Sequence, residues 1–211
     1  MAASAALNPA RKSVISRQEI LDAAAALFRQ KGYYATTLRD IAGSVGMKAG
    51  SVYYHFDSKE QILEAVLDIG IEAVFKDVRH KVENMAEDVA WRERFHIAIE
   101  AHLASLVQHG DYMSANVRVF SQAPEHIRDR HMKIRRAYED YWANLYHRAK
   151  KAGAIRGNIN LTALQALVFG AMNWTIEWYK PGREKIETLA EAYTDILMNG
   201  VQPTERDSAA K

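Results

Sequence analysis

A short polar segment near the N-terminus carries the residues best suited to contact nucleic acid. From Met47 to Phe56 the chain runs Met-Lys-Ala-Gly-Ser-Val-Tyr-Tyr-His-Phe. Val52 and Phe56 are four residues apart, so they share one helical face and can anchor the segment to a core. Small residues allow close approach to a partner, and lysine, tyrosine and histidine side chains can bond to phosphates and base edges. We therefore predict DNA contacts from Lys48, Ala49, Gly50, Ser51, Tyr53, Tyr54 and His55.

The flanking residues add further donors. Thr36, Thr37 and Arg39 begin a preceding short helix, which in a helix-turn-helix unit crosses the DNA backbone and donates to phosphates. Lys59 follows the segment and is predicted to take part as well. Residues 11–59 contain eight Lys or Arg against four Asp or Glu, a modestly basic composition. The alternative is that Tyr-Tyr-His-Phe is an ordinary helix end with half-buried aromatics, but the surrounding pattern favours DNA binding.

Helical periodicity dominates the rest of the chain, and we find no alternating strand pattern. Ser16 is expected to cap a first helix that Gly32 ends, and Ser58 to cap a long fourth helix. We predict an all-α fold, in which a three-helix head with a helix-turn-helix is joined by that long helix to a C-terminal helical bundle. The nine expected helices lie at about 17–31, 36–46, 48–55, from 59 onward, 90–108, 112–120, 126–151, 161–179 and 183–198.

Composition limits where a function can reside. The 28 basic and 26 acidic residues leave a net charge of +2, so nucleic-acid binding has to come from a local patch. The absence of cysteine excludes disulfides and thiolate sites and fits a cytoplasmic protein, and we find no signal peptide and no run of roughly 18–20 apolar residues. We expect a disordered arm at 1–13, a DNA-binding head at 14–74, a ligand-binding and dimerising body at 75–202, and a disordered tail at 203–211.

Three stretches of the head occur in a recognisable order. These are 32–42 (Gly-Tyr-Tyr-Ala-Thr-Thr-Leu-Arg-Asp-Ile-Ala), 45–46 (Val-Gly) and 50–60 (Gly-Ser-Val-Tyr-Tyr-His-Phe-Asp-Ser-Lys-Glu). Together they resemble the TetR family of repressors. The resemblance implies a one-component repressor that binds operator DNA as a dimer and is released by a small ligand held in its helical body. Family members often have Ser-Lys-Gly where this chain has Lys48-Ala49-Gly50, so the lysine sits one residue earlier and on another helical face.

Two apolar stripes near the C-terminus are candidates for self-association. One stripe runs from Leu161 to Met172 and the other from Ile186 to Leu197, each with helical spacing. The plain alternative is that both stripes close the core of a single protomer. Resemblance to the family implies a four-helix interface with two helices from each protomer, and a dimer doubles the contacted DNA site. We predict a homodimer.

The middle helices mix aromatic and polar residues, as ligand sites do. For any one of these residues core packing is the better interpretation, whereas the existence of a pocket is implied by the resemblance. The predicted lining is Tyr112, Met113, Asn116, Phe120, Tyr138, Trp142, Tyr146, Phe169, Asn173, Trp174 and Trp178.

The ligand class is suggested by a second likeness. The segment 170–183 (Gly-Ala-Met-Asn-Trp-Thr-Ile-Glu-Trp-Tyr-Lys-Pro-Gly-Arg) resembles a branch of the family that senses acyl-CoA or steroid-derived CoA thioesters. Residues 128–151 carry eight Lys or Arg against three Asp or Glu, and guanidinium groups pair well with phosphates such as those of CoA. The alternative is that this charge run is a solvated helix face. The sequence therefore leaves two interpretations of this charge run, a site for a CoA thioester and a solvated helix face.

The sequence contains no motif that predicts catalysis. The loop at 43–51 lacks the Gly-Lys-Ser/Thr ending of a phosphate-binding loop, and there is no Gly-x-Ser-x-Gly elbow. His96 and Glu100 share a helical face, but two ligands do not make a metal site. We expect no catalytic residues, no metal and no cofactor. The competing interpretation is an all-helical small-molecule-binding or interaction module without DNA-binding activity.

Overall fold

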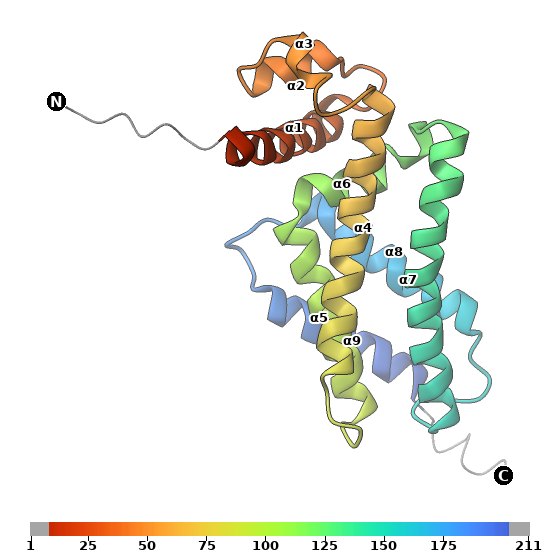
Figure 1. Cartoon of the computed structure of the whole chain (residues 1–211). Coiled ribbons are helices and arrows are strands. Elements are labelled where there is room, and N and C mark those ends of the chain that lie inside the picture. Colours follow the sequence, from red (N-terminus) through yellow and green to blue (C-terminus); the bar gives the residue numbers. More distant parts are fainter. Residues whose placement is uncertain (1–8, 203–211) are drawn as a thin grey trace. The chain divides into compact units, whose positions relative to one another are not determined.

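Helices make up almost all of the structure, a computed structural model that describes residues 9–202. Among these residues no strand occurs, which confirms the predicted all-α class. The predicted arm over 1–8 and the predicted tail at 203–211 lie outside the described residues. The elements are α1 (Pro9–Lys31), α2 (Leu38–Ser44), α3 (Ala49–Val52), α4 (Lys59–Glu83), α5 (Trp91–Gln108), α6 (Gly110–Arg118), the 3₁₀ turn η1 (Phe120–Gln122), α7 (Glu125–Lys151), α8 (Leu161–Trp178) and α9 (Ile186–Val201) (Figure 1).

The described residues form two compact units, each made of two chain segments. Residues 9–70 together with 111–131 form the head unit, and residues 71–110 together with 132–202 form the body unit. The head therefore includes α6 and the start of α7, which the continuous division at residue 74 assigned to the body. The reason is packing, since Tyr112, Ala115, Val119 and Ile127 are buried in one apolar cluster with residues of α1 and α4.

Helix α1 begins earlier than predicted. It starts at Pro9, so Ser16 lies inside it and does not cap it, and the expected loose arm over 9–13 is helical. Proline is well accommodated in the first turn of a helix, where its missing N–H has no intrahelical partner to lose. The other end is as predicted, because Gly32 takes the left-handed conformation (φ 79°) and its N–H donates to Phe28 O.

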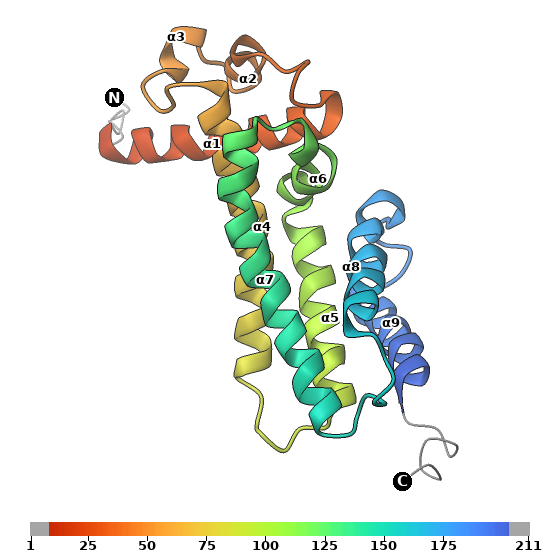
Figure 2. The same ribbon diagram turned by 90° about the vertical axis from the view of Figure 1, so that its right-hand side faces the viewer.

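A capping box defines the start of α2. Thr37 is the N-cap, and its Oγ1 accepts from Asp40 N while the Asp40 carboxylate accepts from Thr37 N. These hydrogen bonds lower the pKa of the Asp40 carboxyl. The turn after α2 passes through Gly46, whose φ of 67° suits glycine, and leads directly into α3. Within the head unit α2 and α3 lie side by side (Figures 1 and 2).

Polar contacts tie α6 and α7 to the rest of the head unit. His131 is fully buried, with Nδ1 2.8 Å from Asp68 Oδ1 and Nε2 2.9 Å from Asn116 Oδ1. Asn116 also donates through Nδ2 to the carbonyl of Leu67 at 2.8 Å. Also on α6, the Tyr112 hydroxyl donates to Asp22 of α1 at 2.5 Å. Burial and this contact raise the pKa of Tyr112.

The body unit is a helical bundle in which α5 packs against both α8 and α9. Arg92 of α5 pairs with Glu191 and Asp195 of α9, and Asn160 caps α8 by accepting from Ala163 N at 3.1 Å. Helices α8 and α9 lie side by side (Figure 2). None of the helices among residues 9–202 combines the length and the apolar character that a membrane span requires.

Candidate nucleic-acid interface and ligand site

The segment around α3 presents its polar residues outward. Val52 and Phe56 are buried, as predicted, and anchor α3 to the core of the head unit. Tyr54 is 90 % exposed and Tyr53 57 % exposed. Ser51 and His55 are half-buried, so the outer surface of this segment is dominated by the two tyrosines.

The α3 helix is shorter than predicted. It ends at Val52, and Tyr53 to His55 form a turn in which His55 N donates to Val52 O at 2.9 Å. Gly50, β-branched Val52 and the aromatic residues all have weak helix propensity, which explains the early end. The turn still projects Tyr53 and Tyr54 to solvent, because Phe56 N bonds back to Val52 O and keeps the chain close to the core.

Two residues predicted to contact DNA have structural roles instead. Thr36 is fully buried and its hydroxyl donates to Gly32 O at 2.8 Å, so the prediction that it contacts phosphate is wrong. Lys59 donates through Nζ to the carbonyls of Tyr33 and Thr36, at 2.9 and 2.8 Å. The Lys59 ammonium also lies 4.1 Å from the centre of the Tyr33 ring, and burial lowers the pKa of Lys59. Lys59 therefore holds the turn before α2.

The remaining predicted contacts are accessible. Thr37, Arg39, Lys48 and Gly50 are exposed, and Ala49 is half-buried against the core. Lys48 has an extended backbone (φ −75°, ψ 145°) and is the N-cap of α3. Its one-residue displacement from the family pattern thus places it at the start of the helix, outside the helical turns.

The predicted ligand residues divide between the two units. Tyr112, Met113, Asn116 and Phe120 belong to the head unit, where Tyr112 and Phe120 pack in or against the core and Asn116 is hydrogen-bonded to its neighbours. That these four residues line a ligand pocket stays a prediction. Sequence periodicity placed them on an inner helical face but did not show which core that face belongs to.

The body unit brings Tyr138, Phe169 and Asn173 together around a histidine that the sequence analysis missed. His102 of α5 is buried, with Nδ1 2.7 Å from the Tyr138 hydroxyl and Nε2 3.2 Å from Asn173 Oδ1. Phe169 meets the rings of both His102 and Tyr138 edge-on, at 6.0 and 5.5 Å. Burial lowers the pKa of His102 to about 4, so the imidazole is neutral at pH 7. The sequence feature that could have identified His102 is its position on the apolar face of α5, one turn after Ile99.

Two predicted ligand residues lie at the surface. Trp174 is 64 % exposed and Trp178 44 % exposed, and the ring contact of Trp178 is with Tyr179. In contrast, Trp142 and Tyr146 are fully buried. Trp174 and Trp178 therefore do not line the buried centre of this protomer.

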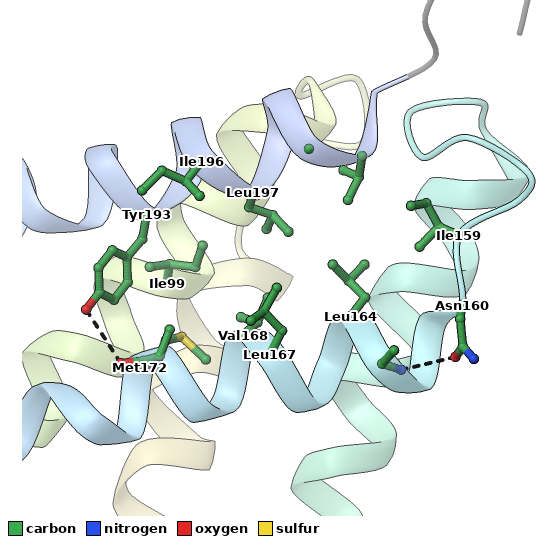
Figure 3. A pocket seen from close by; sticks show the side chains of 14 residues that line it. Ile99, Ile159, Asn160, Leu164, Leu167, Val168, Met172, Tyr193, Ile196 and Leu197 are labelled. Atoms are coloured by element: carbon green, nitrogen blue, oxygen red, sulfur yellow. Dashed lines mark hydrogen bonds between the residues drawn. The ribbon is translucent and has the colours of Figure 1, made fainter.

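An apolar groove of about 450 Å³ runs between α8 and α9 (Figure 3). Leu167 and Ile196, on its two sides, are 71 % and 73 % exposed. Figure 3 shows Val168 and Leu197 facing one another across it, with Ile99 between the two helices. Nearly every lining residue is apolar. An exposed apolar surface of this kind is typical of a protein interface.

The basic residues of α7 belong to both units. Arg128 and Arg130 belong to the head unit, where Arg130 pairs with Glu64 at 3.0 Å. Lys150 donates to Ile159 O at 3.0 Å in the body unit. Arg130 and Lys150 thus have local partners. Within residues 9–202 no group of three His, Cys, Asp or Glu is placed to hold a metal ion.

Two family models match this chain and together span both units. The model described as "Bacterial regulatory proteins, tetR family" matches residues 20–66. The model described as "Tetracyclin repressor-like, C-terminal domain" matches residues 88–201, more than half of the chain.

Curated relatives match either most of the chain or a short part of it. The HTH-type transcriptional repressor KstR2 of Rhodococcus jostii is 27 % identical over 191 residues, covering 88 % of this chain and 90 % of the relative. The biofilm operon regulator IcaR of Staphylococcus aureus is 56 % identical over 48 residues, which cover 23 % of this chain and 26 % of the relative.

Solved structures agree on the fold. The structure of the ketosteroid transcriptional regulator KstR2 of Mycobacterium tuberculosis superposes with a TM-score of 0.79 at 23 % identity, covering 90 % of this chain and 96 % of that one. The structure of AibR in complex with isovaleryl coenzyme A and operator DNA superposes with a TM-score of 0.76 at 25 % identity, covering 86 % and 97 %.

Proposed function

This chain belongs to the TetR family of bacterial regulatory proteins, and from that membership we propose that it is a one-component repressor that binds operator DNA through its head unit. The observation that carries the proposal is the exposed polar surface around α3, where Tyr53 and Tyr54 project from a turn anchored by buried Val52 and Phe56. The proposed contacts are Thr37, Arg39, Lys48, Ala49, Gly50, Ser51, Tyr53, Tyr54 and His55.

The substitution Tyr54→Ala tests this assignment. Tyr54 is 90 % exposed, so its removal should leave the unfolding midpoint unchanged. A lost base or phosphate contact costs about 1–3 kcal/mol, which is about five- to 150-fold in operator affinity. The measurement is an electrophoretic mobility shift with DNA from upstream of the protein's own gene. The control is Tyr34→Ala, because Tyr34 is 75 % exposed in the same unit but lies before α2. Equal losses in the two variants would contradict a specific role for α3.

We also propose that two copies of the chain associate through the groove between α8 and α9. Leu167 and Ile196 are exposed apolar side chains on either side of it, and burying them against a second copy removes them from water. A two-fold dimer gives the two heads two half-sites on one operator. No charged residue lines the groove. An apolar surface of this kind suits a permanent interface.

The effector is proposed to bind in the body unit, around His102, Tyr138, Trp142 and Phe169. A CoA thioester is the proposed class, because the relative AibR binds isovaleryl coenzyme A and the relative KstR2 is a ketosteroid regulator. Helices α4 and α7 contribute residues to both units, so a shift of either helix on ligand binding provides a route to the heads. The protein is proposed to act in the cytoplasm, where its operator is.

Release of operator DNA tests the effector class. Isovaleryl-CoA and a steroid-derived CoA thioester are added separately to a preformed protein–operator complex. We expect at least one of them to weaken operator binding about 5- to 150-fold, the usual range of allosteric coupling. The free acids and CoA alone serve as controls and should leave the complex intact. If no thioester changes the affinity, or if the free acids act equally, the thioester assignment is wrong.

A further inference from the structure

The turn between α1 and α2 contains a backbone donor that its own helix end does not satisfy. Helix α1 ends with Gly32 N donating to Phe28 O at 2.9 Å, which is the single hydrogen bond of a left-handed cap. In the longer form of this cap, the Schellman motif, the same carbonyl accepts from the following residue instead. That residue is Tyr33, which is only 5 % exposed, so water is a poor partner for its N–H. The acceptor has to come from another part of the chain.

Gln122 of η1 supplies this acceptor. Its Oε1 accepts from Tyr33 N at 3.0 Å, although the two residues are 89 positions apart. The amide oxygen has to face Tyr33, because a backbone N–H can only donate. The same side chain lies against Gly32, where an added Cβ would be 3.3 Å from Gln122 Oε1. Glycine at this position therefore allows both the left-handed φ of 79° and the close approach of the amide.

Contacts from α4 and within the turn hold the same few residues. Lys59 donates to the carbonyls of Tyr33 and Thr36, at 2.9 and 2.8 Å. The Thr36 hydroxyl donates to Gly32 O at 2.8 Å. The next residue, Thr37, is the N-cap of α2. The path of the chain into α2 is therefore determined by η1 and α4 as well as by the local capping box.

We propose that Gln122 is a positioning residue for operator binding, which holds the turn before α2 in the conformation that presents α2 and α3 to DNA. The inference rests on the proposed repressor function and extends its machinery to η1, a segment far from α2 and α3 in the sequence. Without the Gln122 oxygen, Tyr33 N is a buried donor with no acceptor, which favours conformations of the turn that expose it to water. A smaller fraction of the molecules then has α2 correctly placed, and the apparent operator affinity falls by that fraction.

Amide hydrogen exchange on the full-length protein without DNA tests the hydrogen bond. Gln122→Met removes the oxygen and keeps the length of the side chain. We expect the Tyr33 amide to exchange about tenfold faster or more in this variant, because the bond that protects it is lost. The matched control is Gln18→Met, since Gln18 also joins α1 to α6, by donating to the Tyr112 hydroxyl at 3.0 Å. In that variant the Tyr33 amide should exchange within about twofold of the unmodified protein.

Competition between operator DNA and unrelated DNA of the same length tests the effect on function. The operator fragment comes from upstream of the protein's own gene, and the readout is the ratio of the two affinities, in which general effects of charge cancel. Gln122→Met should lower this ratio about fivefold, the usual worth of one hydrogen bond, whereas Gln18→Met should keep it within about twofold. Gln122→Glu should restore most of the ratio, because a carboxylate oxygen also accepts from Tyr33 N. A side chain that only fills space would not be rescued in this way.

Three results would overturn the proposal. They are equal exchange of the Tyr33 amide in Gln122→Met and Gln18→Met, equal specificity ratios in these two variants, or a Gln122→Glu variant that behaves like Gln122→Met. Gln122 is half-buried, so the methionine variant should fold, which its circular dichroism spectrum checks. Failure of the repressor assignment has a different signature, because the unmodified protein then shows no preference for the operator while amide exchange still reports the bond to Gln122.

Discussion

A chain carrying both Leu167→Glu and Ile196→Glu should be monomeric and should lose operator binding. The two side chains are 71 % and 73 % exposed on either side of the α8–α9 groove, so a single protomer tolerates charge there. In a dimer the same positions are buried, and an unpaired carboxylate removed from water costs several kcal/mol. Analytical ultracentrifugation should show a protomer of 23.9 kDa.

Operator affinity should fall about a hundredfold or more in this variant, because one head alone contacts a single half-site. Val107→Glu is the matched control, since Val107 is an exposed apolar residue of α5 outside the groove. It should remain dimeric and bind DNA normally. A double variant that sediments as a dimer, or a monomer with full operator affinity, would show that the groove is not the interface needed for repression.

Gly70→Ala should destabilise the head unit even though alanine is the better helix former. A Cβ at Gly70 would lie 2.5 Å from Asn116 Nδ2 and 3.0 Å from the carbonyl oxygen of Tyr112. The amide cannot move aside freely, because it donates to Leu67 O and its oxygen is bonded to His131. Overpacking of this kind costs about 1–3 kcal/mol, more than the roughly 1 kcal/mol gained in helix propensity.

Urea unfolding followed by circular dichroism measures the effect. The matched control is Gly43→Ala in α2, where a Cβ meets nothing within 4 Å, so propensity alone acts and stability should rise by up to about 1 kcal/mol. If both substitutions stabilise the protein, α4 and α6 have room to separate and the close contact at Gly70 is not a constraint. In a double-mutant cycle, Gly70→Ala should cost less in an Asn116→Ala background than in the native chain, because the nearer clash is absent there.

The α3 surface could be predicted because its determinants are local. Val52 and Phe56 are one turn apart, so one face had to be buried, and the tyrosines between them had to point elsewhere. The caps are local too. Thr37 and Asp40 form their capping box within four residues, and Gly32 ends α1 by its own conformational freedom. Interactions between residues this close in sequence do not depend on the rest of the fold.

Only tertiary contacts decide the different roles of residues that are neighbours in the sequence. Thr36 and Thr37 have the same side chain, yet Thr36 is buried behind the turn while Thr37 is exposed as a cap. Lys59 is a suitable donor to phosphates or base edges by its side chain, and its ammonium donates to carbonyls more than twenty residues earlier in the chain. The sequence contains no local mark of such a contact, because it depends on where α4 begins relative to the turn before α2.

The division of the middle helices is also a tertiary property. Tyr112 and Asn116 are an aromatic and a polar residue of the kinds that line pockets. Hydrogen bonds to Asp22, Leu67 and His131 nevertheless place them in the head unit. His102 was overlooked for the same reason, since its partners are 36 and 71 residues away. Periodicity determined that these residues face inward. Only the packing of distant helices decided which core each one enters, because a helical face carries no information about the surface that will cover it.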